Sequence, residues 1–236
     1  MLKNHIRFNW GNLARTLCFV ALVLFMASCL DDDDSQNQVT PVAYVAIYHA
    51  SPNAPELDVI VDERPVNRLE FTDYTGYLNF YTGQRNFKIN PFNASNSLVD
   101  TTITFRDGAF YSLFIVNDLP NVEALAVRDS ASAPSEGKAK VRFINLSPDA
   151  GALEVSTNDE DSSLFDAGEF KQPSNFVEVD GGSSSFVLKS AGGSDQLVTV
   201  SDIALRPGRF YTIIARGFVN PPAGNNNKLS LEVITN

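Results

Sequence analysis

The first residues that could do chemistry are a histidine, a serine and an aspartate that lie close together in the sequence. His49, Ser51 and Asp58 supply the base, the hydroxyl and the orienting carboxylate that acyl transfer by a nucleophilic serine needs. However, Ser51 precedes a proline, and this pair favours a turn in which the hydroxyl caps the backbone. A second, similar segment has Asn145 at the position of His49, and an amide cannot act as a base. We therefore expect His49 to be structural, with an envelope hydrolase that uses His49 as the alternative.

A short run of tyrosines is the better candidate for a binding surface. If residues 77–81 form a strand, the apolar side chains at positions 78 and 80 point to the core. The candidate ligand-binding residues then lie on the opposite face: Tyr77, Asn79 and Tyr81, with Tyr74 in the turn before them. Tyrosine rings stack on sugar rings and on peptide side chains, and the hydroxyl and amide groups orient them. The alternative is that these rings only pack across strands on an outer sheet face.

The sequence predicts no metal site and no cofactor. His49 is the only histidine beyond residue 5, so a zinc site built from several imidazoles is excluded for the later part of the chain. The acidic stretch at residues 158–161 lacks the spacing and the glycine of an EF-hand loop, and a solvated hairpin loop is the better interpretation. The formal net charge of −10 argues against nucleic acid as a partner, because a nucleic-acid binder needs a basic face.

The beginning of the chain is typical of an export signal. It has basic residues, no acidic residue up to position 28, and an apolar run at 17–26, which is too short to span a bilayer but suits a signal peptide. The segment Met26-Ala27-Ser28-Cys29 resembles the lipobox of bacterial lipoproteins, with Met in place of the usual Leu. This resemblance implies that residues 1–28 are a lipoprotein signal peptide and that Cys29 is the site of lipid attachment. The alternative is an ordinary secretory cleavage with Cys29 as an incidental thiol.

The segment after Cys29 refines the expected location. Removal of residues 1–28 leaves Cys29 as the only cysteine, and acylation consumes its thiol, so disulfides and thiolate chemistry are excluded. The four aspartates at 31–34 resemble the acidic export signal of surface lipoproteins in Bacteroidota, and they also form a solvated spacer. We expect residues 29–41 to be an acidic tether of a protein that is lipid-anchored in the outer membrane at the cell surface. The periplasmic leaflet is the alternative.

The rest of the chain repeats itself, which is its most informative internal feature. The segment VAIYHASPNAPELDV at residues 45–59 matches VRFINLSPDAGALEV at residues 141–155, and further matches follow in the same order. Each copy has a length that suits a seven-stranded β-sandwich. We expect a first β-sandwich over residues 42–129, a linker over residues 130–138 and a second β-sandwich over residues 139–236.

The local pattern favours strands throughout. Apolar and polar residues alternate, turn clusters rich in Pro, Gly and Asp interrupt the runs, and helical spacing is not sustained in the expected mature chain. The segment LRPGRFY at residues 205–211 resembles the corner of immunoglobulin-like sandwiches in which a tyrosine hydroxyl bonds back to the connecting loop, and residues 105–111 repeat the frame. The predicted fold class is all-β, with two tandem immunoglobulin-like antiparallel β-sandwich domains.

One longer segment resembles a known family. The sequence HASPNAPELDVIVD at residues 49–62, followed by a small apolar turn at 74–77 and by Gly83, resembles the opening of a bacterial family named domain of unknown function 4397. The resemblance is strong over residues 43–128 and weaker over residues 139–234. It implies tandem β-sandwich modules of secreted or anchored proteins, and it implies no activity.

Together these features predict a non-enzymatic, lipid-anchored module for binding, adhesion or assembly. Its expected partners are the membrane, through the lipid, and a glycan or protein ligand. Two other hypotheses stay open at this point, namely an envelope hydrolase that uses His49 and a passive structural spacer.

Overall fold

The computed structural model describes residues 40–157 and 163–236. The predicted signal peptide, Cys29 and the tether up to residue 39 therefore lie outside the described residues, as does the acidic stretch at 158–161. Within the two described ranges the regular structure is β-strand. A search of the same ranges finds no helix with the length and apolar character needed to cross a bilayer.

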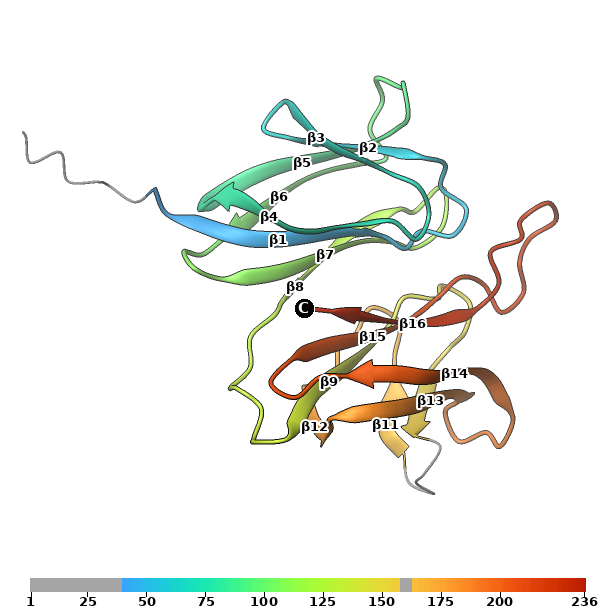
Figure 1. Ribbon diagram of the computed structural model, residues 1–236. Coiled ribbons are helices and arrows are strands. Elements are labelled where there is room, and N and C mark those ends of the chain that lie inside the picture. The colour runs from blue at the N-terminus through green and yellow to red at the C-terminus, as the bar shows by residue number, and fades with distance from the viewer. Residues whose placement is uncertain (1–39, 158–162) are drawn as a thin grey trace, which may run out of the picture. The chain divides into compact units, whose positions relative to one another are not determined.

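Eight strands form a first β-sandwich of two four-stranded sheets. One sheet has the order β4-β1-β7-β8 and the other the order β3-β2-β5-β6, and Figure 1 shows them as two layers. The strands are β1 (Val42–His49), β2 (Leu57–Val61), β3 (Arg64–Leu69), β4 (Tyr74–Tyr81), β5 (Gly83–Pro91), β6 (Val99–Phe105), β7 (Phe110–Val116) and β8 (Glu123–Arg128).

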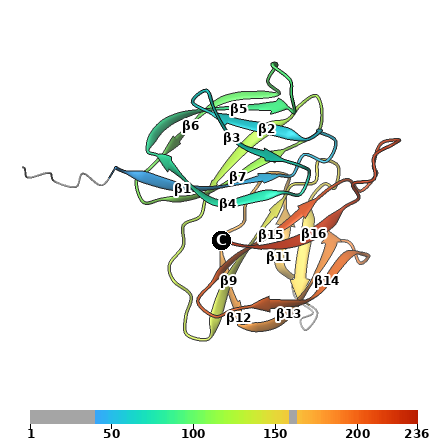
Figure 2. The same ribbon diagram turned by 45° about the horizontal axis from the view of Figure 1, so that its top comes forward.

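The second β-sandwich repeats this arrangement strand by strand. Its sheets have the orders β12-β9-β15-β16 and β11-β10-β13-β14, which are the orders of the first sandwich with each number raised by eight. Its strands, all but β10 labelled in Figure 2, are β9 (Lys138–Asn145), β10 (Leu153–Thr157), β11 (Ser163–Gly168), β12 (Val177–Asp180), β13 (Gly182–Ser190), β14 (Gln196–Leu205), β15 (Phe210–Arg216) and β16 (Ser230–Thr235). The repeat in the sequence is therefore also a repeat in topology.

The predicted all-β fold with two sandwiches is confirmed, and two details differ from the prediction. Each sandwich has eight strands rather than seven, and each contains one parallel pair, β1 with β7 and β9 with β15. Parallel neighbours need a long connection, and here nearly the whole sandwich lies between the two strands in the sequence. Immunoglobulin-like sandwiches share an architecture without always sharing one topology.

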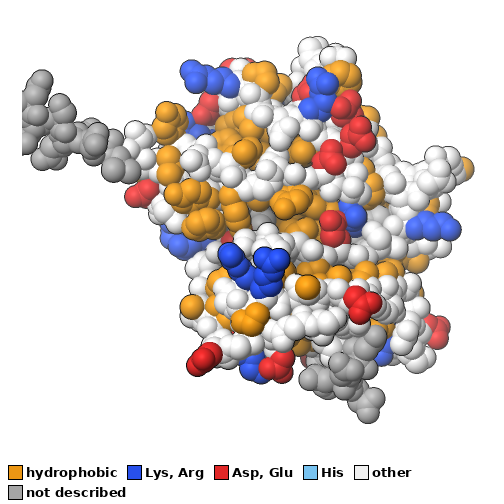
Figure 3. Space-filling model, viewed as in Figure 1, with side chains coloured by type: hydrophobic (Ala, Val, Ile, Leu, Met, Phe, Trp, Pro, Cys, Tyr) orange, Lys and Arg blue, Asp and Glu red, His pale blue; other side chains and the backbone are white. Residues whose placement is uncertain are grey.

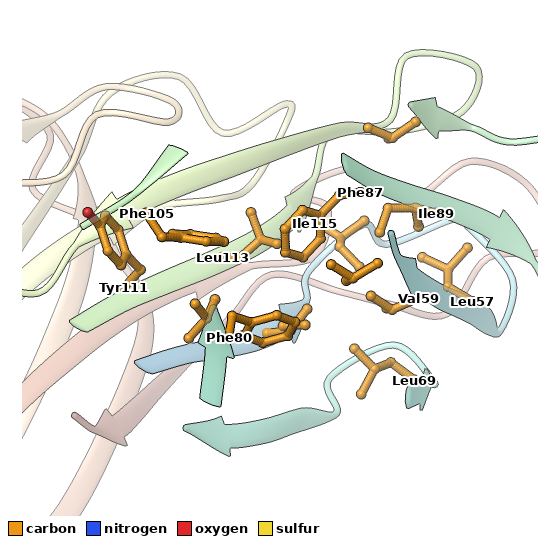
Figure 4. Close-up of a cluster of buried hydrophobic side chains, with 14 of the residues drawn as sticks. Leu57, Val59, Leu69, Phe80, Phe87, Ile89, Phe105, Tyr111, Leu113 and Ile115 are labelled. Carbon is orange, nitrogen blue, oxygen red and sulfur yellow. The ribbon is translucent and has the colours of Figure 1, made fainter. Parts of the chain in front are cut away.

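The alternation of apolar residues fills the space between the sheets. In β5, Phe87 and Ile89 are fully buried, whereas Lys88 between them is partly exposed. Figure 4 shows how such side chains from both sheets of the first sandwich meet, with Leu113 and Ile115 of β7 opposite those of β5. Because burial of one side chain of this size contributes about 1.5–3 kcal/mol, the two cores account for the stability of a chain that we expect to lack disulfides.

The predicted tyrosine corner is present in both copies. The hydroxyl of Tyr111 accepts a hydrogen bond from the backbone N–H of Arg106 at 3.3 Å, and that of Tyr211 accepts one from Arg206 at 2.8 Å. Each bond satisfies a backbone donor where the chain crosses between sheets.

A third apolar cluster joins the two sandwiches, and Pro41–Asn236 form one compact unit. The cluster contains Tyr48, Ala50, Phe114, Val116 and Val127 from the first sandwich and Ile144, Leu146, Ile214 and Ile234 from the second. The strand registers make these sets equivalent except for Val116, since Tyr48 pairs with Phe114 as Ile144 pairs with Ile214. The same sheet face of each copy thus contributes to one buried contact.

Candidate functional site

The tyrosines that the sequence singled out lie on β4, at the edge of its sheet, where β4 pairs with β1. Phe80 is 8% exposed and belongs to the first core, and Leu78 packs against the same core. Asn79 and Tyr81 are exposed, and 61% of Tyr81 is accessible to solvent. The predicted alternation of β4 is therefore confirmed.

Asn79 and Tyr81 line a groove of about 660 Å³ in the first sandwich, which we call the β4 groove. Its lining comes from both sheets and also includes Val42, Val61, Asp62, Arg64, Val66, Phe80 and Arg85. Figure 3 shows hydrophobic side chains interspersed with polar and charged ones on the face that carries β1 and β4. The groove therefore combines an exposed aromatic ring with polar groups.

One carboxylate of the β4 groove is held in place from two sides. Asp62 Oδ2 accepts a hydrogen bond from Arg85 Nη1 at 2.8 Å, and Asp62 Oδ1 accepts one from the backbone N–H of Asn86 at 3.0 Å. The bond from Asn86, helped by Arg85, lowers the pKa of the Asp62 carboxyl, so that it stays ionised at neutral pH. Asp62 and Glu63 have φ values of 48° and 62°, a conformation that is strained for residues other than glycine. These contacts hold the strained turn.

Tyr77 lies in a different hollow, which we call the aromatic pocket. This pocket has a volume of about 310 Å³ and is lined by Tyr77, Phe110, Asp129, Ala131, Phe176, Phe210 and Asn236. The hydroxyl of Tyr77 donates to Asp129 Oδ2 at 2.7 Å. Burial, together with the neighbouring carboxylate of Asp129, raises the pKa of the Tyr77 hydroxyl far above its ordinary value, so it stays a donor.

Tyr74 belongs to neither hollow. Its ring centroid lies 6.4 Å from that of Tyr48, and 49% of its surface is exposed. A strand rises about 3.3 Å per residue, so the two ends of β4 lie about 23 Å apart. The four predicted residues therefore do not form one site: only Asn79 and Tyr81 share a hollow.

His49 is fully buried, and both of its ring nitrogens have backbone partners. Nδ1 accepts a hydrogen bond from the N–H of Ser51 at 3.3 Å, and Nε2 lies 3.1 Å from the carbonyl oxygen of Pro55, to which it donates. Asn145 makes the same two kinds of bond, to Ser147 and to Gly151. The geometry therefore supports the structural interpretation of this position.

The side chains of Ser51 and Asp58, the other two members of the proposed nucleophilic group, are not hydrogen-bonded to His49. The hydroxyl of Ser51 is buried and has no hydrogen-bond partner among the described residues, so it does not cap the turn as the sequence suggested. Asp58 instead accepts a hydrogen bond from Arg68 Nε at 3.1 Å on the exposed side of the sheet. The residues therefore lack the chain of hydrogen bonds that acyl transfer needs.

The burial of His49 predicts a pH-dependent stability. Burial lowers the pKa of His49, so below about pH 6.5 the unfolded chain takes up a proton that the folded chain does not. The free energy of unfolding should then fall as the pH drops from 7.5 to 5.5, at most by about 1.4 kcal/mol per pH unit. Urea denaturation at several pH values measures this slope, and His49→Asn should remove most of it. An equal slope in the two proteins would contradict the prediction.

A search of residues 40–157 and 163–236 finds no group of three or more His, Cys, Asp or Glu side chains arranged to hold a metal ion. The acidic stretch for which a calcium site was considered lies outside those ranges.

Sequence reasoning missed a buried ion pair next to the aromatic pocket. The side chains of Arg142 and Asp129, only 2% and 4% exposed, form a salt bridge. Asp129 Oδ2 also accepts a hydrogen bond from the hydroxyl of Ser112 at 2.8 Å, and Arg142 Nε donates to Thr212 Oγ1 at 2.9 Å. The available signal was weak: Arg142 alternates with apolar residues in β9, and Asp129 adjoins a small, polar stretch that is typical of a solvated linker.

Comparison with protein families gives one match, to the domain of unknown function 4397, over residues 43–156. The match begins at the second residue of β1, covers the rest of the first sandwich and extends into β10. A comparison with curated proteins gives no match.

The chain is also similar to solved carbohydrate-binding modules. One is a family 41 module from streptococcal virulence factors that recognises α-glucan, with 14% identity and a TM-score of 0.24, over 71% of this chain and 92% of that one. Another is a family 26 module from Eubacterium rectale in complex with maltoheptaose, with 9% identity and a TM-score of 0.26, over 82% of this chain and 97% of that one. Likenesses at this level give no ground for assigning a ligand.

Proposed function

We propose, from the family match over residues 43–156 and the geometry of the β4 groove, that this chain is a non-enzymatic module that binds a carbohydrate. In this proposal Cys29 is acylated, and the tether at residues 29–41 holds the folded part at the outer surface of the outer membrane. The second sandwich is a second copy of the same family, which its identical strand order supports.

The observation that carries the proposal is an exposed ring beside fixed polar groups in one groove. A sugar ring packs its C–H groups on an aromatic side chain, while its hydroxyls need donors and acceptors. Tyr81 supplies the ring, and the amide of Asn79 supplies both a donor and an acceptor. Asp62 adds an ionised acceptor that Arg85 holds in place, and Arg64 adds further donors.

The state of His49 supports the non-enzymatic part of the proposal. A general base must reach a substrate proton with a free nitrogen, and both nitrogens of His49 are engaged inside the loop that they hold together. The side chain is also fully buried, so a substrate has no access to it.

Tyr81→Ser is expected to weaken carbohydrate binding at least tenfold, because it removes the stacking surface and leaves the rest of the groove intact. A glycan array probed with the full chain identifies the sugar, and titration calorimetry with that sugar measures the change.

Tyr74→Ser is the matched control, since Tyr74 is another exposed tyrosine of β4 outside the groove. It should bind the sugar as the parent does. If no glycan binds the parent, or if the two variants lose affinity equally, the groove is not a carbohydrate site and the passive spacer becomes the better hypothesis.

A further inference from the structure

The aromatic pocket is built from equivalent residues of the two sandwiches. The strand registers and the strand-end hydrogen bonds make three pairs of lining residues equivalent: Tyr77 with Phe176, Phe110 with Phe210, and Asp129 with Asn236. Ala131, from the connection between the sandwiches, completes the lining. The pocket therefore exists only where the two copies meet, and neither sandwich forms it alone.

The walls of the pocket consist of two aromatic pairs in edge-to-face geometry. The ring centroids of Tyr77 and Phe110 lie 5.2 Å apart with an interplanar angle of 88°. Those of Phe176 and Phe210 lie 5.6 Å apart with an angle of 83°. Aromatic rings prefer such edge-to-face or offset contacts, so a further ring between these walls finds favourable partners on both sides.

The charges beside the pocket exclude a charged guest. Asp129 is neutralised by its salt bridge to Arg142, and it also accepts hydrogen bonds from Tyr77 and Ser112. The guanidinium carbon of Arg142 lies 4.9 Å from the centroid of the Phe176 ring, so a second cation among these rings meets a like charge. An anion finds no unpaired cationic side chain among the lining residues, because the guanidinium of Arg142 is already paired with Asp129.

The polar groups of the pocket are also too few for a sugar. Among the lining residues, Tyr77 and Asp129 already bond to each other, and Asn236 Oδ1 accepts a hydrogen bond from Thr212 at 2.7 Å. A sugar bound here would bury several hydroxyls against aromatic walls. Hydroxyls buried without hydrogen-bond partners cost binding free energy. The aromatic pocket therefore favours a guest that carries no charge and has few polar groups.

We propose that the aromatic pocket binds one neutral aromatic ring, carried either by a small molecule or by a side chain of a polypeptide. The volume of about 310 Å³ suits a guest of this size, since an engineered apolar cavity of about 150 Å³ already binds benzene. The site is separate from the β4 groove and does not depend on the proposed carbohydrate.

The test uses 5-fluoroindole as the probe and the full chain as the protein. Fluorine NMR should show saturable binding of one probe per chain, with displacement by unlabelled indole. Glucose and tetramethylammonium, the neutral sugar and the cation, should not displace it. Displacement by N-acetyltryptophanamide as effectively as by indole indicates a ring carried by a polypeptide, and a much weaker effect indicates a free small molecule.

Two substitutions in the connection between the sandwiches locate the site. Ala131→Trp places a large side chain at the lining position and should weaken probe binding at least tenfold. Ala133→Trp, at another exposed alanine of the connection that does not line the pocket, should leave it unchanged. Tyr81→Ser should also leave it unchanged, which separates this test from that of the β4 groove.

The proposal is overturned if the probe does not saturate, if both alanine variants bind it equally, or if tetramethylammonium displaces it. Should Ala131→Trp not fold, amide shifts in the parent protein decide the question. Shifts confined to residues near Phe110, Phe176 and Phe210 support the proposal, and shifts elsewhere overturn it.

Discussion

Asp129→Asn should lower the free energy of unfolding by about 3–5 kcal/mol, the cost of leaving a buried charge without its partner. The substitution keeps the shape of the side chain, but it removes the negative charge beside the guanidinium of Arg142, which is 2% exposed. The contact between the sandwiches contains this pair, so the loss affects both halves of the protein. Urea denaturation of the parent and the variant measures the difference.

Two further variants separate the charge from the packing. In Asp129→Asn combined with Arg142→Met no charge is left unpaired, so most of the lost stability should return. Asp180→Asn, which breaks the exposed ion pair with Lys138, should change the stability little. If the double variant is as unstable as the single one, the loss comes from the hydrogen bonds of Asp129 rather than from the unpaired charge.

In the proposed lipoprotein, Cys29→Ser should abolish acylation completely and remove the protein from the outer membrane. The thiol of Cys29 is the attachment point in the predicted lipoprotein, and stable anchoring needs more than one acyl chain. Metabolic labelling with an alkyne fatty acid, followed by membrane fractionation, measures both effects.

Cys18→Ser provides the matched control, because Cys18 is the other cysteine of the sequence and lies inside the predicted signal peptide. This variant should be labelled and anchored as the parent is. Labelling that persists in Cys29→Ser would count against the lipobox interpretation.

The local structure was largely predictable from the sequence. Strand alternation identified Leu78 and Phe80 as core-facing residues, and the repeated frame identified Tyr111 and Tyr211 as corner residues, all of which the structure confirms. These features depend on side-chain period and on short-range hydrogen bonds, and both are visible in neighbouring positions of the chain.

The contact between the sandwiches was not predictable in this way. Alternation shows which residues of a strand share a face, but it does not show whether water or another sheet covers that face. Tyr77 was therefore grouped with Asn79 and Tyr81, although its hydroxyl bonds to Asp129 next to the buried contact. The run of three asparagines at 225–227 is likewise typical of a loop tip.

The structure gives two of these asparagines a role in the contact. The side chains of Asn225 and Asn227 donate hydrogen bonds to the carbonyl oxygen of Pro52, at 2.9 and 2.6 Å. Pro52 lies in the first sandwich, 173 and 175 positions away in the chain. A pairing over such a separation leaves no trace in local sequence patterns.

The equivalence of the two contact faces has a consequence for the charges between them. A surface that meets its own copy is the isologous interface of a two-fold homodimer, in which every pairwise interaction must occur twice. Here Arg142 stands where the first copy has Ala46, and Asp129 stands where the second copy has Asn236. Joining both copies in one polypeptide releases them from that symmetry, so the ion pair of Arg142 with Asp129 exists without a symmetric counterpart and makes the two contact faces chemically different.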